Sequence, residues 1–230
     1  MIGKRVWSAG IVSLLVISAA TANAATHIFI VPESGFTDSA FADVAGEPLN
    51  ADVTYTIFPR LLNGQLVSVP MNTQNFATSP DIDRLASHRW ALVIARTSDP
   101  SVPSVALLRQ RNGTTGARDA VTIPSSNVNV GRSFNIPLGD LTGGAAIYIG
   151  NPNAADALID FQYGNSTAPV MTPITVGPTS ASKVTLPSTP TQTNLLINVR
   201  SDFGVVVQAV INKRSILVMP IGPAVGPFGN

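Results

Sequence analysis

Residues that could carry acid–base, nucleophilic or metal chemistry are few in this sequence. It contains two histidines, His27 and His88, and no cysteine. A thiol nucleophile, an iron–sulfur cluster and a Cys/His zinc site are therefore excluded, and two isolated histidines cannot form an H-E-x-x-H metal motif. We expect His27 to be exposed and His88 to pack or hydrogen-bond near Trp90.

One hydroxyl motif deserves a structural test. Residues 180–183 read Ser-Ala-Ser-Lys and match S-x-x-K, in which a lysine one helical turn away activates a serine. The tetrapeptide leads into a run of β-forming residues, where this helical spacing does not apply. We interpret it as the polar edge of a strand.

The paired carboxylates also have simple interpretations. Asp81 and Asp83 follow Ser79-Pro80, a pattern typical of a helix N-terminus, and predict a short helix that ends near Ser87. Asp38, Asp43 and Glu47 lack the dense ligand spacing of a calcium loop and are interpreted as solvated loop residues. The sequence thus predicts a non-enzymatic protein with no catalytic, cofactor-binding or metal-binding residue.

One charge pattern remains. Basic residues gather at one end of the predicted strands, where a partner could contact them: Arg109, Arg111, Arg118, Lys213 and Arg214. The turns at the opposite end carry Asp99, Asp156 and Asp202. The pattern predicts contact with a surface polyanion or with the acidic end of another copy. The alternative is that charges simply collect in solvated turns.

The first 24 residues have the features of a secretory signal peptide. Lys4 and Arg5 form a positive region, Ala9–Ala20 is apolar, and Ala22-Asn23-Ala24 is an A-x-A cleavage site. The apolar run of 12 residues is shorter than the roughly 20 that a membrane-spanning helix needs. We expect cleavage after Ala24, no later transmembrane segment, and export to the periplasm, the cell surface or the extracellular space.

The composition and net charge of the chain restrict the classes of molecule that it could bind. The chain has 230 residues, of which 45% are hydrophobic and 12% are charged. Loss of Lys4 and Arg5 leaves 12 basic against 13 acidic residues and a formal net charge of −1. This balance gives no electrostatic case for nucleic acid or an anionic membrane. Ser, Thr, Asn and Gln must therefore cover much of the exposed surface.

Short runs rich in Val, Ile, Thr and aromatic residues predict an all-β chain of about fifteen strands. The runs recur in a fixed order, which predicts four meander units. The first type is continuously apolar and suits strands that are buried on both faces or central in a sandwich: Ile28–Val31, Ala91–Ala95, Ala145–Ile149 and Leu195–Val199. The second type follows each of these: Val53–Phe58, Val105–Arg111, Ala157–Tyr163 and Val205–Ile211. The third ends at or near proline: Val67–Pro70, Val121–Pro124, Ile174–Pro178 and Ile216–Pro223. The fourth type occurs in the first three units and is absent from the last one: Asn75–Thr78, Ser133–Leu138 and Lys183–Leu186.

Turn residues separate these runs. Asn-containing turns such as Asn212-Lys213 tolerate positive φ, and prolines 70, 124 and 178 would stop the third strand of each unit. Two units per sandwich predict tandem β-sandwiches over residues 25–140 and 141–230. A single continuous sandwich is the alternative.

The third unit carries a resemblance. Its residues Ile149-Gly150-Asn151-Pro152, Phe161, Gly164, Val176-Gly177-Pro178 and Val184-Thr185-Leu186-Pro187 resemble the strand and turn pattern of immunoglobulin-like modules in secreted bacterial surface proteins. The resemblance implies tandem immunoglobulin-like antiparallel sandwiches. The chain lacks the cysteine pair of antibody-type domains.

These observations favour a structural or adhesive component of the cell surface or extracellular matrix that can self-assemble by strand addition. The incomplete last unit is the expected acceptor, and residues 25–31 or 224–230 are the expected donors. The alternative is a monomeric periplasmic or secreted binding module for a glycan or protein partner.

Overall fold

The structure is a computed structural model that describes residues 26–32, 36–43, 52–61, 69–75, 88–97, 104–111, 118–124, 126–139, 141, 143–164, 171–186, 194–212 and 214–222. Within these ranges the chain forms fifteen strands and one four-residue helix. The prediction of an all-β chain is confirmed. The helix predicted to begin at Ser79 lies outside the described residues.

The strands and the helix follow one another in this order: β1 (Thr26–Val31), β2 (Phe36–Asp43), β3 (Asp52–Leu61), β4 (Val69–Asn75), β5 (His88–Thr97), β6 (Ser104–Arg111), β7 (Arg118–Ile123), α1 (Ser126–Asn129), β8 (Ser133–Pro137), β9 (Ala145–Asn151), β10 (Ala157–Tyr163), β11 (Ile174–Val176), β12 (Ser180–Leu186), β13 (Asn194–Val199), β14 (Val206–Ile211) and β15 (Arg214–Val218). Most predicted runs coincide with one strand.

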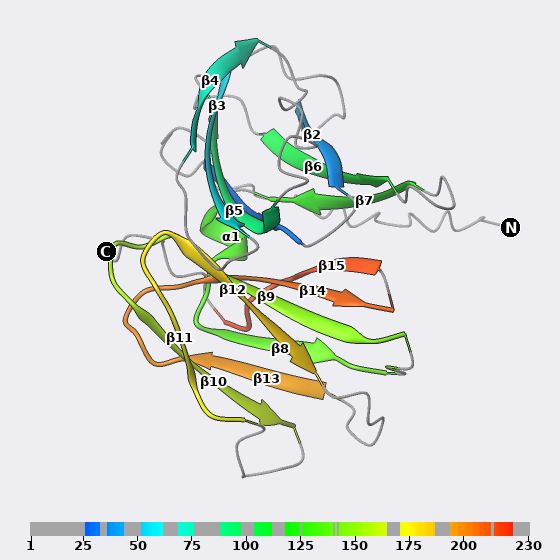
Figure 1. Cartoon of the computed structure of the whole chain (residues 1–230), viewed down its shortest axis with the longest axis vertical. Helices are drawn as coiled ribbons and strands as arrows, with labels where there is room; N and C mark the ends of the chain where they lie inside the picture. Colours follow the sequence, from blue (N-terminus) through cyan, green and yellow to red (C-terminus); the bar gives the residue numbers. More distant parts are fainter. Residues whose placement is uncertain are drawn as a thin grey trace, which may run out of the picture.

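The strands pair in four antiparallel sheets (Figure 1). We number them sheet 1 (β1-β5-β3-β4), sheet 2 (β2-β6-β7), sheet 3 (β8-β13-β10-β11) and sheet 4 (β12-β9-β14-β15). The order β1-β5-β3-β4 of sheet 1 corresponds to the order β8-β13-β10-β11 of sheet 3. The order β2-β6-β7 of sheet 2 corresponds to β9-β14-β15 of sheet 4, where β12 is an additional edge strand. The N-terminal half (β1 to β7) and the C-terminal half (β8 to β15) therefore share one strand topology.

The position of β8 differs from the expected division of the chain. β8 ends at Pro137, before the expected boundary at residue 140, yet it pairs with β13 in the register Asn194↔Pro137 to Asn198↔Ser133. Its inward side chains Phe134 and Ile136 are buried in the core of the C-terminal half. A boundary at 140 would thus cut through sheet 3, and the change between halves falls near α1.

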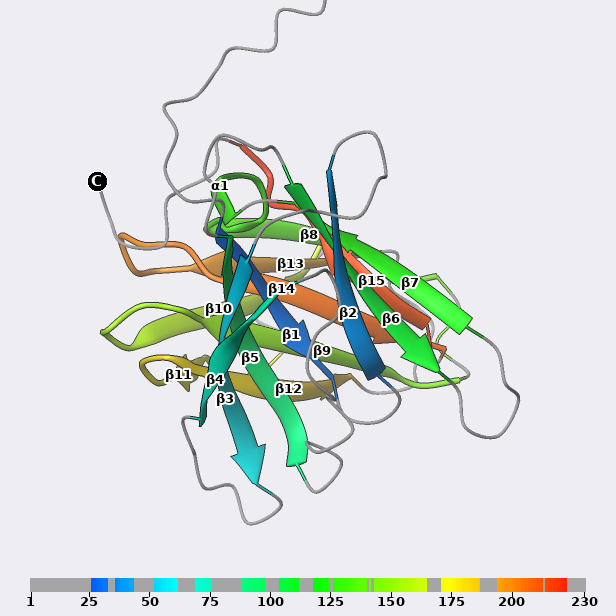
Figure 2. The same ribbon diagram turned by 90° about the horizontal axis from the view of Figure 1, so that it is seen from above.

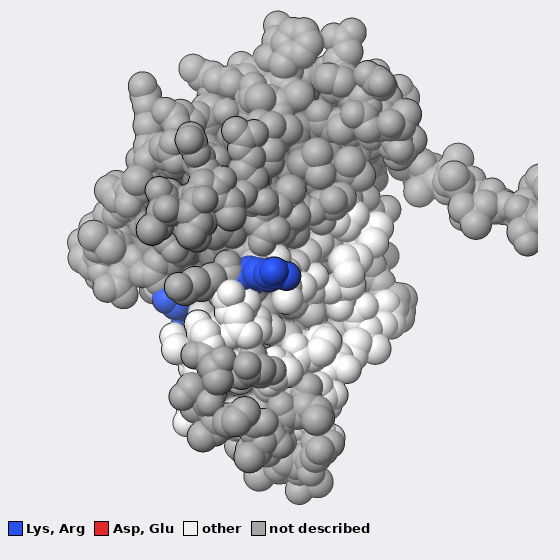
Figure 3. Space-filling model, turned by 90° about the vertical axis from the view of Figure 1, so that its right-hand side faces the viewer, with Lys and Arg blue, Asp and Glu red and all other residues white. Residues whose placement is uncertain are grey.

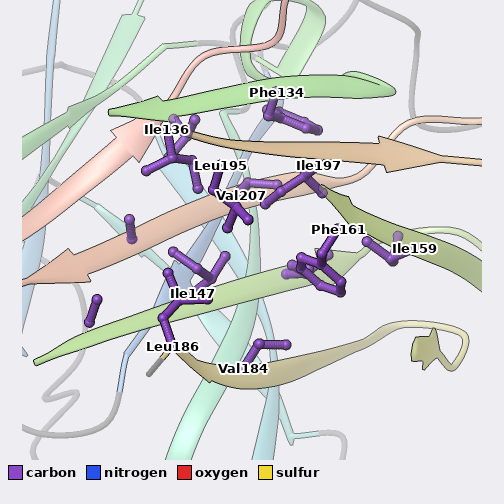
Figure 4. Close-up of a cluster of buried hydrophobic side chains, with 14 of the residues drawn as sticks. Phe134, Ile136, Ile147, Ile159, Phe161, Val184, Leu186, Leu195, Ile197 and Val207 are labelled. Atoms are coloured by element: carbon purple, nitrogen blue, oxygen red, sulfur yellow. The ribbon is translucent and has the colours of Figure 1, made fainter. Parts of the chain in front are cut away.

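The core of the C-terminal half lies between sheets 3 and 4. Aliphatic and aromatic side chains of both sheets point toward one another there, including Phe134, Phe161 and Ile147 (Figure 4). Along β8 the burial pattern alternates, because successive side chains of a strand point to opposite faces. Each fully buried Phe or Ile contributes about 1.5–3 kcal/mol to folding.

The two central strands of sheet 4, β9 and β14, are largely buried on both of their faces. In β9, Ala145, Ile147 and Ile149 belong to the core between sheets 3 and 4, whereas Tyr148 belongs to a second cluster on the opposite face. This arrangement explains the continuous apolar run that the sequence shows there. β13 fits the other interpretation, a strand central in a sandwich, because it lies inside sheet 3, exposes Asn198 and has an alternating burial pattern.

The second cluster joins the two halves. We call it the seam; its buried members are Ile28, Ile30, Leu92, Ile94, Val130, Tyr148, Ala181 and Val206. β1 and β5 of sheet 1 cross over β9, β12 and β14 of sheet 4 at a steep angle (Figures 1 and 2). A Cβ on Gly150 would lie 2.7 Å from Leu92 Cδ1 and 2.8 Å from Val206 Cγ2. Glycine is therefore what permits this close approach of the sheets.

The structure corrects some of the predicted loop and strand boundaries and agrees with others. Asp38 and Asp43 lie in β2, which pairs with β6, and not in a loop. Pro70 lies inside β4, an edge strand, where a missing donor is tolerated. By contrast, β7 ends just before Pro124 as predicted, and Asn212 adopts the predicted positive φ, at 49°.

Candidate functional site

The predicted basic residues of the N-terminal half occupy one hairpin. Arg109 and Arg111 lie on β6, and Arg118 begins β7. The register places Arg111 directly opposite Arg118, and Arg109 opposite Ala120. Like charges on directly opposed positions of a strand pair repel one another. On its other side β6 pairs with β2, which places Arg109 opposite Asp38.

The basic residues of the C-terminal half lie on the same side of the molecule. Arg214 begins β15, opposite Ile211, and is exposed. β15 lies beside β7, and the β6–β7 and β14–β15 hairpins end together at the right of Figure 1. Figure 3 views this side and shows Lys or Arg atoms but no Asp or Glu atoms on its described surface. Lys213 lies outside the described residues.

The predicted acidic turns lie at the other ends of these strands. Asp156 precedes β10 and Asp202 precedes β14; both residues are exposed, and both strands begin at the left of Figure 1. The two turns meet, because Ser201 Oγ donates a hydrogen bond to the Asp156 carbonyl oxygen at 3.4 Å. Asp99 lies outside the described residues. The geometry is thus compatible with the predicted charge polarity.

An ion pair lies on the outer face of sheet 3. Arg200 donates to both carboxylate oxygens of Asp160, from Nε to Oδ2 and from Nη2 to Oδ1, the latter at 2.7 Å. The hydrogen bond to Asp160 and then its charge raise the pKa of Arg200. The exposed fractions of the two side chains are 59% and 26%, so solvent screens this pair.

The seam contains a polar and aromatic latch between β5 and sheet 4. Trp90 Nε1 donates a hydrogen bond to the Ala181 carbonyl oxygen at 2.9 Å. The Trp90 ring meets Tyr148 edge to face with centroids 6.1 Å apart. Lys183 Nζ lies 5.9 Å from the centroid of the same tyrosine ring, in cation–π geometry. This latch joins residues 91 positions apart, so sequence reasoning could not find it.

β1 is held on two sides. It pairs with β5 from Thr26↔Arg96 to Val31↔Ala91. On its other side lies the segment that follows β7, where Asn129 Nδ2 donates to the Ile28 carbonyl oxygen at 2.8 Å. His27 is fully buried, contrary to expectation, and its Nδ1–H donates to the Pro124 carbonyl oxygen at 3.1 Å. Sheet pairing with β5 and these two side-chain bonds thus keep β1 in place.

Buried side-chain polar atoms without a partner concentrate at the seam. Within the described residues there are four such atoms: Asn129 Oδ1, Asn153 Oδ1, Gln208 Oε1 and Gln208 Nε2. Asn129 contacts β1, and Gln208 lies on the seam face of β14, between Val206 and Val210. A sequence signal existed for Gln208, because it is the one polar residue in the predicted strand run Val205–Ile211.

A second buried amide network closes the turns beyond β9. Asn151 Nδ2 donates to the carbonyl oxygens of Ala155, Val176 and Gly177 at 2.7, 3.0 and 3.1 Å. Its Oδ1 accepts bonds from the backbone and side-chain amides of Asn153. These bonds satisfy loop carbonyls and connect β9 to the end of β11, which indicates a structural role.

The S-x-x-K motif at residues 180–183 lies on a strand, and its geometry does not fit a lysine-activated serine. Ser180 and Lys183 lie three positions apart on β12, so they face opposite sides of sheet 4. Ser180 Oγ instead donates to the Gly177 carbonyl oxygen at 3.0 Å. In the described part of the chain, no three His, Cys, Asp or Glu residues are grouped to hold a metal ion. No helix among the described residues has the length and apolar character needed to cross a membrane.

Comparison of the chain with protein-family models, with curated proteins and with solved structures gives no match.

Proposed function

We propose that this chain is an exported, non-catalytic structural or adhesive protein of the cell surface or extracellular matrix, and that copies assemble by exchanging β1. The observation that carries the proposal is the position of β1. It is the first strand of the described chain, it lies at the edge of sheet 1, and its burial is nearly complete from His27 to Val31.

Exchange of an edge strand at the start of the described chain requires a new path only for the connection between β1 and β2. Among the described strands β1 pairs with β5 alone, and Ile28 and Ile30 fill the seam against the C-terminal half. The groove that β1 occupies would accept the same residues from a second copy with identical contacts. Exchange of an identical element is a low-cost route to oligomers, and an edge strand forms strand hydrogen bonds on one side only.

The proposed acceptor is the β1 groove and not the edge of β15. β7 lies beside β15, and Pro220, just after β15, forms a bridge with Phe134 of β8. Residues of the same chain therefore already lie next to the last unit, which we expected to accept a strand because it lacks the fourth run. We retain residues 25–31 as the donor strand; residues 224–230, the other expected donor, lie outside the described residues.

We further propose that both halves are immunoglobulin-like sandwiches. Immunoglobulin sandwiches combine an A-B-E-D sheet with a C-F-G sheet. The orders β1-β5-β3 and β2-β6-β7 correspond to B-E-D and C-F-G. On this assignment β1 takes the place of strand B, and no strand of the described chain occupies position A beside it. This support comes from strand order alone; on that side β1 is held by the side-chain bonds of Asn129 and His27 instead of by a described strand.

Cysteine cross-linking tests the exchange directly, because the natural chain has no cysteine. Two full-length single-cysteine variants, T26C and R96C, carry tags of different size and are co-expressed, purified and mildly oxidised. Thr26 and Arg96 are opposed in the β1–β5 register, where a disulfide can form. We expect a mixed disulfide dimer, and larger oligomers by light scattering and electron microscopy of the same fractions.

Two controls make this result interpretable. The double variant T26C/R96C reports pairing within one chain, and R96C with T175C reports random collision, since Thr175 is exposed on β11 in the other half. A mixed dimer from T26C and R96C that exceeds the collision control supports exchange. Only intrachain bonds, together with a monomer in solution, would sink the proposal and favour the monomeric binding module.

That second candidate function has its own supporting observation. Arg111, Arg118 and Arg214 lie on adjacent hairpins at one end of the molecule, with like charges directly opposed. A monomer could use this end to bind an acidic surface glycan or protein partner.

A further inference from the structure

Three of the four unpaired buried polar atoms in the described residues lie at the seam: Asn129 Oδ1 next to β1, and both amide atoms of Gln208 on the seam face of β14, a strand that β1 contacts. We propose that Gln208 on β14 and Asn129 next to β1 keep the docking of β1 reversible by disfavouring the closed seam. The inference rests on the proposed strand exchange, because it concerns the regulation of that same groove.

The position of Gln208 follows from the alternation of β14. Val207 and Ala209 belong to the core of the C-terminal half, whereas Val206 belongs to the seam and Val210 packs against it. Gln208 therefore points into the seam, where 1% of its surface is exposed. Its register partners are Tyr148 on β9 and Leu217 on β15. Neither its Oε1 nor its Nε2 has a hydrogen-bond partner.

Asn129 has one paired and one unpaired amide atom. Its Nδ2 donates to the Ile28 carbonyl oxygen of β1, while its Oδ1 has no partner. Departure of β1 would let water reach both amides. An amide that is unpaired when β1 is docked and hydrated when β1 leaves favours the open state. Hydrophobic burial of Ile28 and Ile30 opposes this, so the strand stays docked but can leave.

The variant Q208M tests the inference. Methionine has a similar length and no hydrogen-bonding requirement, so it should suit the apolar seam. We expect hydrogen–deuterium exchange of the β1 amides in the full-length protein to slow by roughly ten- to hundredfold, which corresponds to removal of one unsatisfied buried group. The rate of mixed T26C–R96C disulfide formation should fall in parallel.

A matched control makes the same chemical change elsewhere. Gln162 is half-buried on β10, on the outward face of sheet 3, so Q162M should leave the exchange of β1 amides unchanged. Unchanged or faster β1 exchange in Q208M would overturn the inference, because it would mean that a bound water already satisfies the amide. Slower β1 exchange without any mixed disulfide in the parent pair would instead support the inference on docking and refute the proposed assembly.

Discussion

Trp90 and Ala181 connect the two halves of the chain through one hydrogen bond from the indole Nε1 to a backbone carbonyl, 2.9 Å long. The bond joins β5 of sheet 1 to β12 at the edge of sheet 4. It lies beside the Trp90–Tyr148 ring contact and therefore closes one border of the seam.

Replacement of Trp90 by phenylalanine should weaken the seam. W90F keeps an aromatic ring next to Tyr148 but leaves the Ala181 carbonyl without its donor, so we expect a loss of about 1–2 kcal/mol of unfolding free energy. Urea unfolding followed by circular dichroism measures it, since Trp90 is the one tryptophan outside the predicted signal peptide. An unchanged midpoint would show that the bond contributes nothing.

Gly150 should tolerate no side chain. In G150A the new Cβ would meet Leu92 Cδ1, Val206 Cγ2 and Ile30 Cγ1 at 2.7, 2.8 and 3.1 Å. Overpacking of this kind costs about 1–3 kcal/mol, and we expect a matching fall in thermal stability. The control G177A has no atom closer than 3.7 Å to its Cβ and should be near neutral. Equal stability of the two variants would contradict close packing at the seam.

Asn151 should be needed for the turns beyond β9. N151A removes the donor for three carbonyls and the acceptor for Asn153. We expect a loss of about 3 kcal/mol or more in urea unfolding, because several buried groups become unsatisfied together. N135A removes an exposed amide bond to Asn194 and should cost under about 1 kcal/mol. A small effect of N151A would mean that water replaces the amide.

The Asp160–Arg200 pair should not make stability depend on pH near neutrality. Asp160 raises the pKa of Arg200 in the folded state. A raised basic pKa gives a stabilisation that is complete below the unfolded pKa and is lost only as pH rises through the folded one, far above pH 9. The difference in unfolding midpoint between D160N and the parent protein should thus be constant from pH 6 to pH 9. A difference that varies across this range would contradict the assignment.

The basic hairpin ends should bind polyanions if they act as a partner site. The triple variant R111S/R118S/R214S should elute from a sulfated-dextran column at lower salt than the parent protein, with a smaller dependence of binding on salt. The control R132S/R200S changes arginines at the other end of sheet 3, near residues 199–200, and should elute closer to the parent. Equal elution of the two variants would remove the basic end as a binding site.

Much of the secondary structure could be predicted because its causes are local. The runs at Ala145–Ile149 and Ala157–Tyr163 are strands, and proline follows the end of β7. β2 was missed because its sequence, FTDSAFAD, carries two aspartates and resembles a loop. Only its pairing with β6, more than sixty residues away along the chain, makes it a strand.

The basic end could be predicted only in part. Positions in turns follow from strand boundaries, and the opposition of Arg111 and Arg118 follows from a local hairpin. The approach of β7 to β15 is a contact between halves, and nothing local encodes it. The burial of His27 was missed for the same reason, since its partner Pro124 lies 97 residues away.

By itself, then, the sequence determined the all-β class, the strand positions and the places where the chain can reverse, because side-chain alternation, β-branching, glycine and proline act over a few residues. Tertiary structure alone decided which strands pair, that β8 joins β13, and that Gly150, Trp90 and Gln208 meet at one seam. Those choices depend on burial and hydrogen bonding between distant segments, and such energies exist only once the sheets have packed together.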